Sequence, residues 1–330
     1  GDPEIPLDQL EADAVAAETA ALAVDGVRQI ASCGAGWTRT ERWVAASNGF
    51  AAFSQAAASS LGLAAVGERD GRMERDYEAR TTRYRADRPS PEDIGRIAGE
   101  RTAARLGSRR LGTRRAAVIY DRRVSSSLVG AFLAAISGPS VARGISFLKT
   151  ERGKQVFAPG VSIIDDPFRV RGLGSRLHDG EGRPVRETRL IDDGVLTDWL
   201  LNGHSARQLG LTPNGFASMG FGDPPGVAPS NLYMPAGRQS PEEMMRDLGE
   251  GLLITDMFGP SINPNTGDYS VGVSGFWFEG GDIAYPVSEV TVAGDLRSMF
   301  ARLVPANDLE FRSTRDAPSL LIEDMSIAGN

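Results

Sequence analysis

The spacing of apolar positions predicts one helix followed by a run of strands in the first third of the chain. In residues 7–23 apolar side chains recur at helical intervals, which predicts a helix packing through a single stripe of Leu7, Leu10, Val15 and Leu22. Two dipeptides that favour tight hairpin turns follow, Asn48-Gly49 and Asp70-Gly71. They separate four segments that we expect to form a β-meander: Trp37–Ser47, Phe50–Ala58, Leu61–Glu68 and Arg72–Ala86.

A second helix is predicted from Pro91 to Leu106. Ser90 is suited to cap its first turn, Pro91 fits the first helical position, and Gly107 ends it. The charged segment Ser108–Arg115 that follows is short and has no aromatic residue, so we interpret it as a linker and not as a nucleic-acid contact.

The remaining two thirds of the chain predict mostly strands around one buried helix. Ser125–Ser137 is apolar on all sides, which is typical of a buried helix. Another capped helix runs from Ser240 to Leu248, ahead of Gly249. The other expected elements are strands at Ala116–Tyr120, Val156–Asp165 and Leu252–Met257, a hairpin within Glu187–Leu201 turning at Asp193-Gly194, and irregular loops at Gly220–Pro229 and Gly259–Gly267.

The most distinctive stretch is Gly267–Gly294, GDYSVGVSGFWFEGGDIAYPVSEVTVAG. β-Branched and aromatic residues dominate Val271–Phe278 and Ile283–Val292, which predicts two strands. Gly280-Gly281 between them permits the positive φ of a hairpin tip. The whole pattern predicts an α+β protein of two domains. Residues 1–110 form a β-meander with helices, and residues 111–330 form a larger, β-rich mixed domain.

Charge and composition narrow the function classes. A net charge of −7 argues against a duplex-DNA binder, whose affinity comes largely from phosphate neutralisation. The one cysteine, Cys33, excludes an internal disulfide and a multi-thiolate metal site. No apolar run is long enough for a transmembrane helix, and the acidic N-terminus lacks the layout of a signal peptide, so we expect a cytoplasmic protein without membrane contact.

Several motifs in the right order resemble the TldD/TldE (PmbA) family, named for modulation of DNA gyrase. They are the Gly267–Gly294 hairpin, the ending Met325–Asn330 (MSIAGN), Ser47–Phe50, Asp76-Tyr77, the Pro91–Leu106 helix and Val141–Leu148 (VARGISFL). The pattern is closest to the TldE/PmbA branch. The resemblance implies a PmbA/TldD-like fold covering the central and C-terminal domains. It also implies that the N-terminal domain usual in the family is missing from this chain.

The catalytic TldD branch carries an HExxxH motif, in which histidines bind zinc and a glutamate activates water. Counting back from the shared glycine at Gly144, that motif falls on residues 129–134. Val129 and Ala134 then occupy the ligand positions and Gly130 the position of the general base. None of the three can bind zinc or move a proton. The resemblance therefore implies no catalytic residue and no metal or other cofactor in this chain, with zinc expected in a TldD-type partner.

A few polar and aromatic residues remain as candidates for lining a cleft or an interface. Asp268, Tyr269 and Ser270 are candidates for a shared cleft, although the favoured interpretation of Asp268 is a turn residue bonded to its own backbone. Glu289 is a further candidate, with an exposed strand residue or a structural ion pair as the alternative. Phe276 and His204 complete the set, and His204 could instead cap the short helix that ends at Gly210.

Three functions follow for testing. The first is a non-catalytic subunit that pairs with a TldD-type chain into a heterodimeric zinc peptidase acting on unfolded peptides. The second is a non-catalytic peptide- or protein-binding homodimer. The third, an autonomous hydrolase, requires catalytic groups that the sequence does not supply: Cys33 has no nearby histidine, and no G-x-S-x-G elbow occurs.

Overall fold

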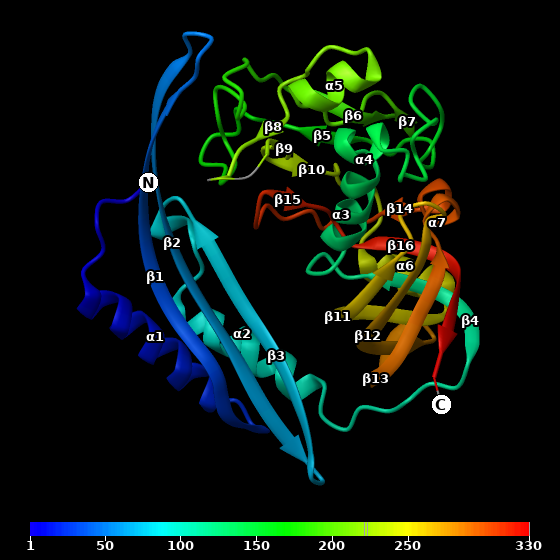
Figure 1. The fold of residues 1–330 in the computed structure, drawn as a ribbon. Helices are drawn as coiled ribbons and strands as arrows, with labels where there is room; N and C mark the ends of the chain where they lie inside the picture. Colours follow the sequence, from blue (N-terminus) through cyan, green and yellow to red (C-terminus); the bar gives the residue numbers. More distant parts are fainter. Residues whose placement is uncertain (221, 223, 330) are drawn as a thin grey trace. The chain divides into compact units, whose positions relative to one another are not determined.

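The computed structural model describes residues 1–220, 222 and 224–329, and Figure 1 draws its ribbon. The chain divides into two compact units. The first holds residues 1–109 together with Arg171–Leu173, and the second holds residues 110–170 and the chain from Gly174 onward. Each unit surrounds a hydrophobic core of its own with helices and strands. The α+β class predicted from the sequence is therefore confirmed.

The first unit packs two helices against one antiparallel sheet (Figure 1). Its elements are α1 (Leu7–Leu22), β1 (Val27–Ala45), β2 (Ala51–Arg69), β3 (Arg72–Thr82), the 3-10 turn η1 (Arg85–Asp87) and α2 (Pro91–Ala104). The sheet has the order β1-β2-β3. Its core is built mainly from small and aliphatic residues: Ala17, Ala21, Val27, Leu61, Leu63, Ala65, Ile94 and Ala98.

The apolar stripe predicted for the first helix is wrong. Three of its members are largely exposed: Leu7 at 79%, Val15 at 56% and Leu22 at 49%. The buried face carries Ala17 and Ala21 instead. A Cβ added at Gly95 of α2 would lie only 1.9 Å from the carbonyl oxygen of Ala17. Helices this close admit only alanine-sized side chains between them, so the larger residues of α1 lie on the solvent side.

The meander has three strands and not four. The predicted break between Ala58 and Leu61 is wrong, because Ser59 and Ser60 pair with both neighbouring strands inside a continuous β2. β1 begins at Val27, well before the predicted Trp37, and β3 ends at Thr82, short of the predicted Ala86.

Local signals in the first unit were interpreted correctly. Both turns lie where expected, with positive φ at Gly49 (87°) and Gly71 (75°). The Ser90 hydroxyl caps α2 by accepting a hydrogen bond from the backbone N–H of Asp93 at 3.1 Å. The helix ends at Ala104, two residues before the predicted Leu106.

The larger sheet of the second unit closes on itself (Figure 1). It has the order β13-β12-β11-β4-β16-β14, and β13 also pairs with β16, so that five strands form a ring. The strands are β4 (Arg114–Tyr120), β11 (Glu250–Ile262), β12 (Asp268–Glu279), β13 (Asp282–Asp295), β14 (Val304–Pro305) and β16 (Leu320–Ala328).

A second sheet of short strands and several helices complete this unit. The sheet order is β15-β10-β5-β6-β7, and β8 pairs with β9. These strands are β5 (Ile163–Asp165), β6 (Thr188–Asp192), β7 (Val195–Leu196), β8 (Ala217–Ser218), β9 (Gly226–Val227), β10 (Leu232–Tyr233) and β15 (Arg315–Asp316). The helices are α3 (Ser126–Ala135), α4 (Gly138–Ala142), α5 (Gly203–Leu209), α6 (Pro241–Leu248) and α7 (Leu296–Arg302). α3 is largely buried in the main core, as predicted.

Predictions from turn and cap signals hold in this unit too. β12 and β13 form the expected hairpin, with φ of 61° at Gly280 and 87° at Gly281. β6 and β7 form the other, around Asp193-Gly194. α6 begins with a capping box, in which Ser240 and Glu243 exchange backbone and side-chain hydrogen bonds.

Four predicted segments of this unit have bounds that differ from those in the structure. The predicted strand Val156–Asp165 reduces to β5, because Pro159 lacks an N–H and Gly160 has a φ of 86°. The predicted loop Gly259–Gly267 starts late, since a bulge lets β11 continue to Ile262. The predicted linker Ser108–Arg115 contains the first residues of β4, which pair with β16. The predicted loop Gly220–Pro229 contains β9, and residues 221 and 223 within it lie outside the described part of the chain.

No helix among the described residues combines the length and the apolar character needed to cross a membrane.

Candidate functional site

Helix α3 carries the three positions at which the family resemblance places zinc chemistry. Val129 is 2% exposed and belongs to the main core, whereas Ala134 is exposed. Gly130 lies close to Arg315, since a Cβ added there would be 3.0 Å from its Nη1. At these positions α3 offers aliphatic groups and bare backbone, and the neighbouring guanidinium repels a divalent cation.

The wider surroundings supply no substitute ligands. Among the residues that the structure describes, no three His, Cys, Asp or Glu side chains gather so that they could hold a metal ion. Zinc in proteins takes three or four such side chains. In the described part of the chain, no such group of side chains is therefore placed to hold a zinc ion.

The start of β12 does not bring its three candidate residues onto one surface. Asp268 is exposed, and its Oδ2 accepts a hydrogen bond from the Thr266 hydroxyl at 2.6 Å, which is a side-chain contact and not the bond to its own backbone that the turn-residue alternative describes. Strand alternation turns Tyr269 to the opposite face, where it is 4% exposed beside Tyr120. Burial raises the pKa of Tyr269 to about 12, so it remains a neutral phenol. Only Asp268 and Ser270 share a face.

The other three candidates lie apart from one another. Glu289 is exposed on β13 and pairs with Arg110, the structural alternative given above. Phe276 is half-buried opposite Pro286, eight positions and roughly 27 Å along β12 from Asp268. His204 is exposed on the first turn of α5. It does not cap that helix, because Asn202 Oδ1 accepts the Ser205 N–H at 2.8 Å.

Sequence reasoning missed a buried acid on the short strand β15. Asp316 is 5% exposed, and its Oδ1 accepts hydrogen bonds from the backbone of Arg312 (3.1 Å) and Ser313 (2.9 Å). Its Oδ2 lies 3.8 Å from Arg169, whose guanidinium stacks 3.5 Å above the Phe311 ring. Burial raises the pKa of Asp316 to about 6. An acid in a polar loop gives no sequence signal for such burial.

A cavity of about 740 Å³ on the second unit was also missed. Its walls come from residues 183–186, from Asp198 and Leu201, from residues 210–215, and from the single residue Arg152. Arg152, Arg183 and Arg186 line it together with one acid, Asp198. This size is typical of sites for small organic ligands, and the charges favour an anion.

Comparisons with known proteins agree on one family. Residues 2–106 match the profile described as PmbA/TldA metallopeptidase central domain, and residues 113–329 match the corresponding C-terminal domain. Metalloprotease PmbA of Escherichia coli O157:H7 is 39% identical over 271 residues, which are 82% of this chain and 58% of that protein. A Haemophilus influenzae PmbA homologue is 35% identical over 272 residues, again 82% of this chain and 58% of that protein.

Solved structures share the fold. A Thermotoga maritima protein named as a modulator of a DNA gyrase superimposes with a TM-score of 0.90 at 28% identity, over 98% of this chain and 75% of its own. TldE from Thermococcus kodakarensis superimposes with a TM-score of 0.88 over 99% of this chain and 75% of its own. At 20% identity the latter likeness concerns the fold alone. This chain thus spans little more than half the length of the curated relatives named above.

Proposed function

The chain belongs to the PmbA/TldD family, and from this premise we propose that it is the metal-free partner subunit of a TldD/TldE-type heterodimeric zinc peptidase. The catalytic partner would hold the zinc ion, and this chain would complete a chamber for unfolded peptides. Its contribution would be shape and peptide binding, without bond cleavage.

The observation that carries the proposal is the chemistry of α3. Peptide hydrolysis by a zinc enzyme needs metal ligands, a bound water and a base that removes its proton. Val129, Gly130 and Ala134 supply none of these, and Arg315 adds a positive charge beside Gly130. A chain that has the fold of a peptidase family, but whose α3 lacks zinc ligands and a general base at these positions, is suited to bind peptides or shape a chamber and not to cleave peptide bonds.

A two-stranded extension of the first unit supports association with another subunit. β3 pairs with β2 only from Ser59 onward, so residues 38–45 and 51–58 form a ribbon of β1 and β2 alone. Trp43 and Phe53 face each other across it, with ring centroids 4.7 Å apart and exposures of 69% and 53%. Two-stranded ribbons are marginally stable by themselves, and exposed aromatic pairs are typical of interfaces. The same ribbon favours the second candidate, a peptide-binding homodimer.

Reconstitution tests the proposal. The chain is purified alone and together with a TldD-type chain that carries HExxxH, and zinc content, assembly state and cleavage of an unstructured fluorogenic peptide are measured. We expect cleavage only by the heterodimer, with zinc bound in the pair and none at stoichiometric level in this chain alone. Stoichiometric zinc or peptide cleavage in the isolated chain would contradict the proposal.

Variants at the ribbon test whether it carries the association between subunits. The double change Trp43→Ser and Phe53→Ser should weaken heterodimer formation at least tenfold. Met73→Ser, at a residue 69% exposed on β3, is the matched control and should leave it unchanged. A stable homodimer that binds peptides and ignores the TldD-type chain would favour the second candidate instead.

A further inference from the structure

The arginine-lined cavity of the second unit is a site that the proposed function does not yet use. Three guanidinium groups and one carboxylate line it, in a chain whose net charge is −7. A concave surface with an excess of one charge concentrates ligands of the opposite charge. Arg152 pairs with Asp198 and Arg183 pairs with Glu181, so the unbalanced positive charge at the cavity is that of Arg186.

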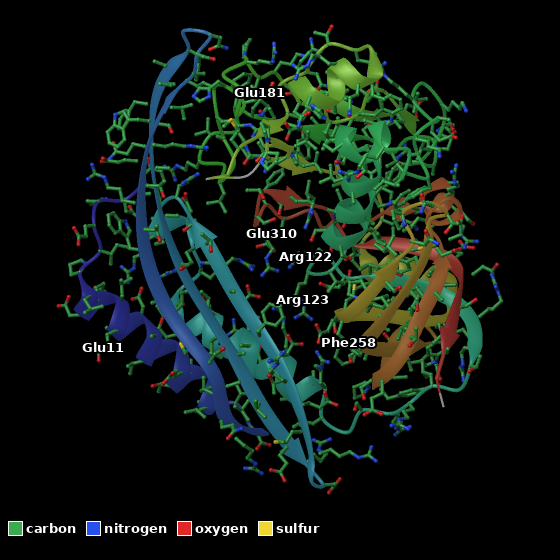
Figure 2. All side chains as sticks on the ribbon, in the orientation of Figure 1. Glu11, Arg122, Arg123, Glu181, Phe258 and Glu310 are labelled. Carbon is green, nitrogen blue, oxygen red and sulfur yellow. The ribbon has the colours of Figure 1, made fainter. Side chains whose placement is uncertain are left out.

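Hydrogen bonds connect wall segments of the cavity, or residues next to them, to one another. Both carboxylate oxygens of Glu181, labelled in Figure 2, accept the N–H of Gly203 at the start of α5, at 2.9 and 3.0 Å. The Asn214 side chain donates to Asp198 Oδ2 at 3.2 Å and accepts the Leu201 N–H at 2.9 Å. The cavity is thus preformed, which lowers the cost of ordering it on binding.

The terminal guanidinium nitrogens of the three arginines are available to a ligand. Arg152 approaches Asp198 through Nε at 3.1 Å, and Arg183 approaches Glu181 through Nε at 3.4 Å. Arg186 forms no side-chain hydrogen bond or ion pair with any residue in the described part of the chain. The terminal nitrogens of all three likewise donate no hydrogen bond to a described residue. Such guanidinium nitrogens can bind a carboxylate through two parallel hydrogen bonds.

Part of the wall is apolar. Val185, Leu211 and Pro213, which line the cavity, are half-buried, and Leu201, which also lines it, is 1% exposed. An inorganic anion would leave this surface unused. A ligand that combines a carboxylate with an aliphatic side chain would cover both the guanidinium groups and the apolar wall.

We propose that this cavity binds the free C-terminal carboxylate of a peptide, with the last side chain against Val185, Leu201 and Leu211. The proposal rests on the proposed function, because it names the part of a peptide substrate or product that this subunit would hold. Asp198 does not oppose binding, since its charge is already engaged by Arg152 and Asn214.

Fluorescence anisotropy on the isolated full chain tests the proposal. The probe is an N-terminally fluorescein-labelled Ala-Gly-Ala-Leu peptide with a free C-terminus, compared with the same peptide as its C-terminal amide. We expect the amide to bind at least tenfold more weakly, and the affinity of the free acid to fall as NaCl rises, because charge pairing is screened. Equal affinity for acid and amide would overturn the proposal.

Variants and competitors make the test specific. Arg186→Gln removes an exposed, unpaired guanidinium without disturbing the hydrogen bonds between wall segments and should weaken the free acid at least tenfold. Arg189→Gln is the matched control, on the neighbouring β6 and paired with Asp192, and should change affinity less than twofold. If inorganic phosphate competes as well as unlabelled Ala-Gly-Ala-Leu, the cavity is a general oxyanion site and the proposal is wrong.

The outcomes separate this inference from the proposed function. A peptidase-active heterodimer whose isolated subunit shows no preference for the free acid would refute the cavity proposal alone. Carboxylate-dependent binding by a chain that never assembles with a TldD-type partner would refute the heterodimer and leave the cavity proposal standing.

Discussion

Replacing Asp13 by alanine should destabilise the first unit more than any ordinary surface change. Asp13 lies on the inner face of α1 and is 3% exposed. Its oxygens accept hydrogen bonds from Arg85 Nη2 (2.6 Å), Arg88 Nη2 (2.6 Å) and Gln9 Nε2 (3.0 Å). The acid therefore ties α1 to the segment that connects β3 to α2.

The magnitude follows from Arg88, which the change would leave buried without a counter-charge. The Arg88 side chain is 1% exposed, and its Nε and Nη1 have no hydrogen-bond partner among the described residues. Breaking a buried pair by removing one partner costs about 3–5 kcal/mol. Against a typical domain stability of about 5–15 kcal/mol, that loss is a large fraction.

The pH dependence of this effect has a defined sign. Burial alone would raise the pKa of Asp13, but hydrogen bonds from Arg85 and Arg88 outweigh it and hold the pKa below its usual value. The stabilisation is therefore fully present above the unfolded pKa of about 3.9 and is lost as pH falls through the folded pKa. The difference between the wild type and Asp13→Ala should shrink below about pH 4.

Urea unfolding followed by hydrogen exchange and mass spectrometry measures the effect in each unit separately. Peptides from residues 7–22 and 91–104 should lose protection at lower urea, while peptides from residues 250–262 should not change. Glu11→Ala, on the solvent side of the same helix (Figure 2), is the control and should stay within about 0.5 kcal/mol. A loss below 1 kcal/mol for Asp13→Ala, or an equal shift in both units, would refute the reasoning.

Two further predictions concern close packing and a buried acid. Gly95→Ala should destabilise the first unit by about 1–3 kcal/mol despite the better helix propensity of alanine, because the new Cβ would meet the Ala17 carbonyl at 1.9 Å. Gly34→Ala, with open space around it, is its control in thermal unfolding. Asp316→Asn should be more stable relative to the wild type at pH 7.5 than at pH 4.5. We expect the free energy of unfolding of the second unit to differ by about 1–2 kcal/mol between the two comparisons, a figure reduced for partial solvent screening of the charge. Burial raises the pKa of Asp316 to about 6, so the native state binds the proton more tightly and wild-type stability falls as pH rises from about 4 to 6. If the urea midpoints of the wild type and of Asp316→Asn depended equally on pH, the prediction for Asp316 would be wrong.

The ribbon of β1 and β2 shows which features of the first unit local sequence patterns could predict and which they could not. Its turn at Asn48-Gly49 was predictable, because a positive φ at glycine is a property of the local backbone. The length of β2 was not, because Ser59 and Ser60 look like a break until both neighbouring strands pair with them. The exposed Trp43–Phe53 pair follows only from the place where β3 stops accompanying β2.

The candidate site divides in the same way. Val129, Gly130 and Ala134 lack ligand chemistry whatever the fold, because residue type alone decides that aliphatic groups cannot bind zinc. The carboxylates singled out from the sequence, Asp268 and Glu289, lie apart on exposed positions, since neither local pattern nor motif carries distance information.

The sequence by itself determined the family, the α+β class, the turns and the helix caps, because each depends on residue identity or on a few neighbouring backbone groups. Only the tertiary structure decided that α1 buries alanines and an acid in place of its leucines, because the close approach of α2 sets which side chains fit. It also decided that arginines from residues 152 and 183–186 share one cavity with residues 210–215, since these segments meet only through contacts between distant parts of the chain.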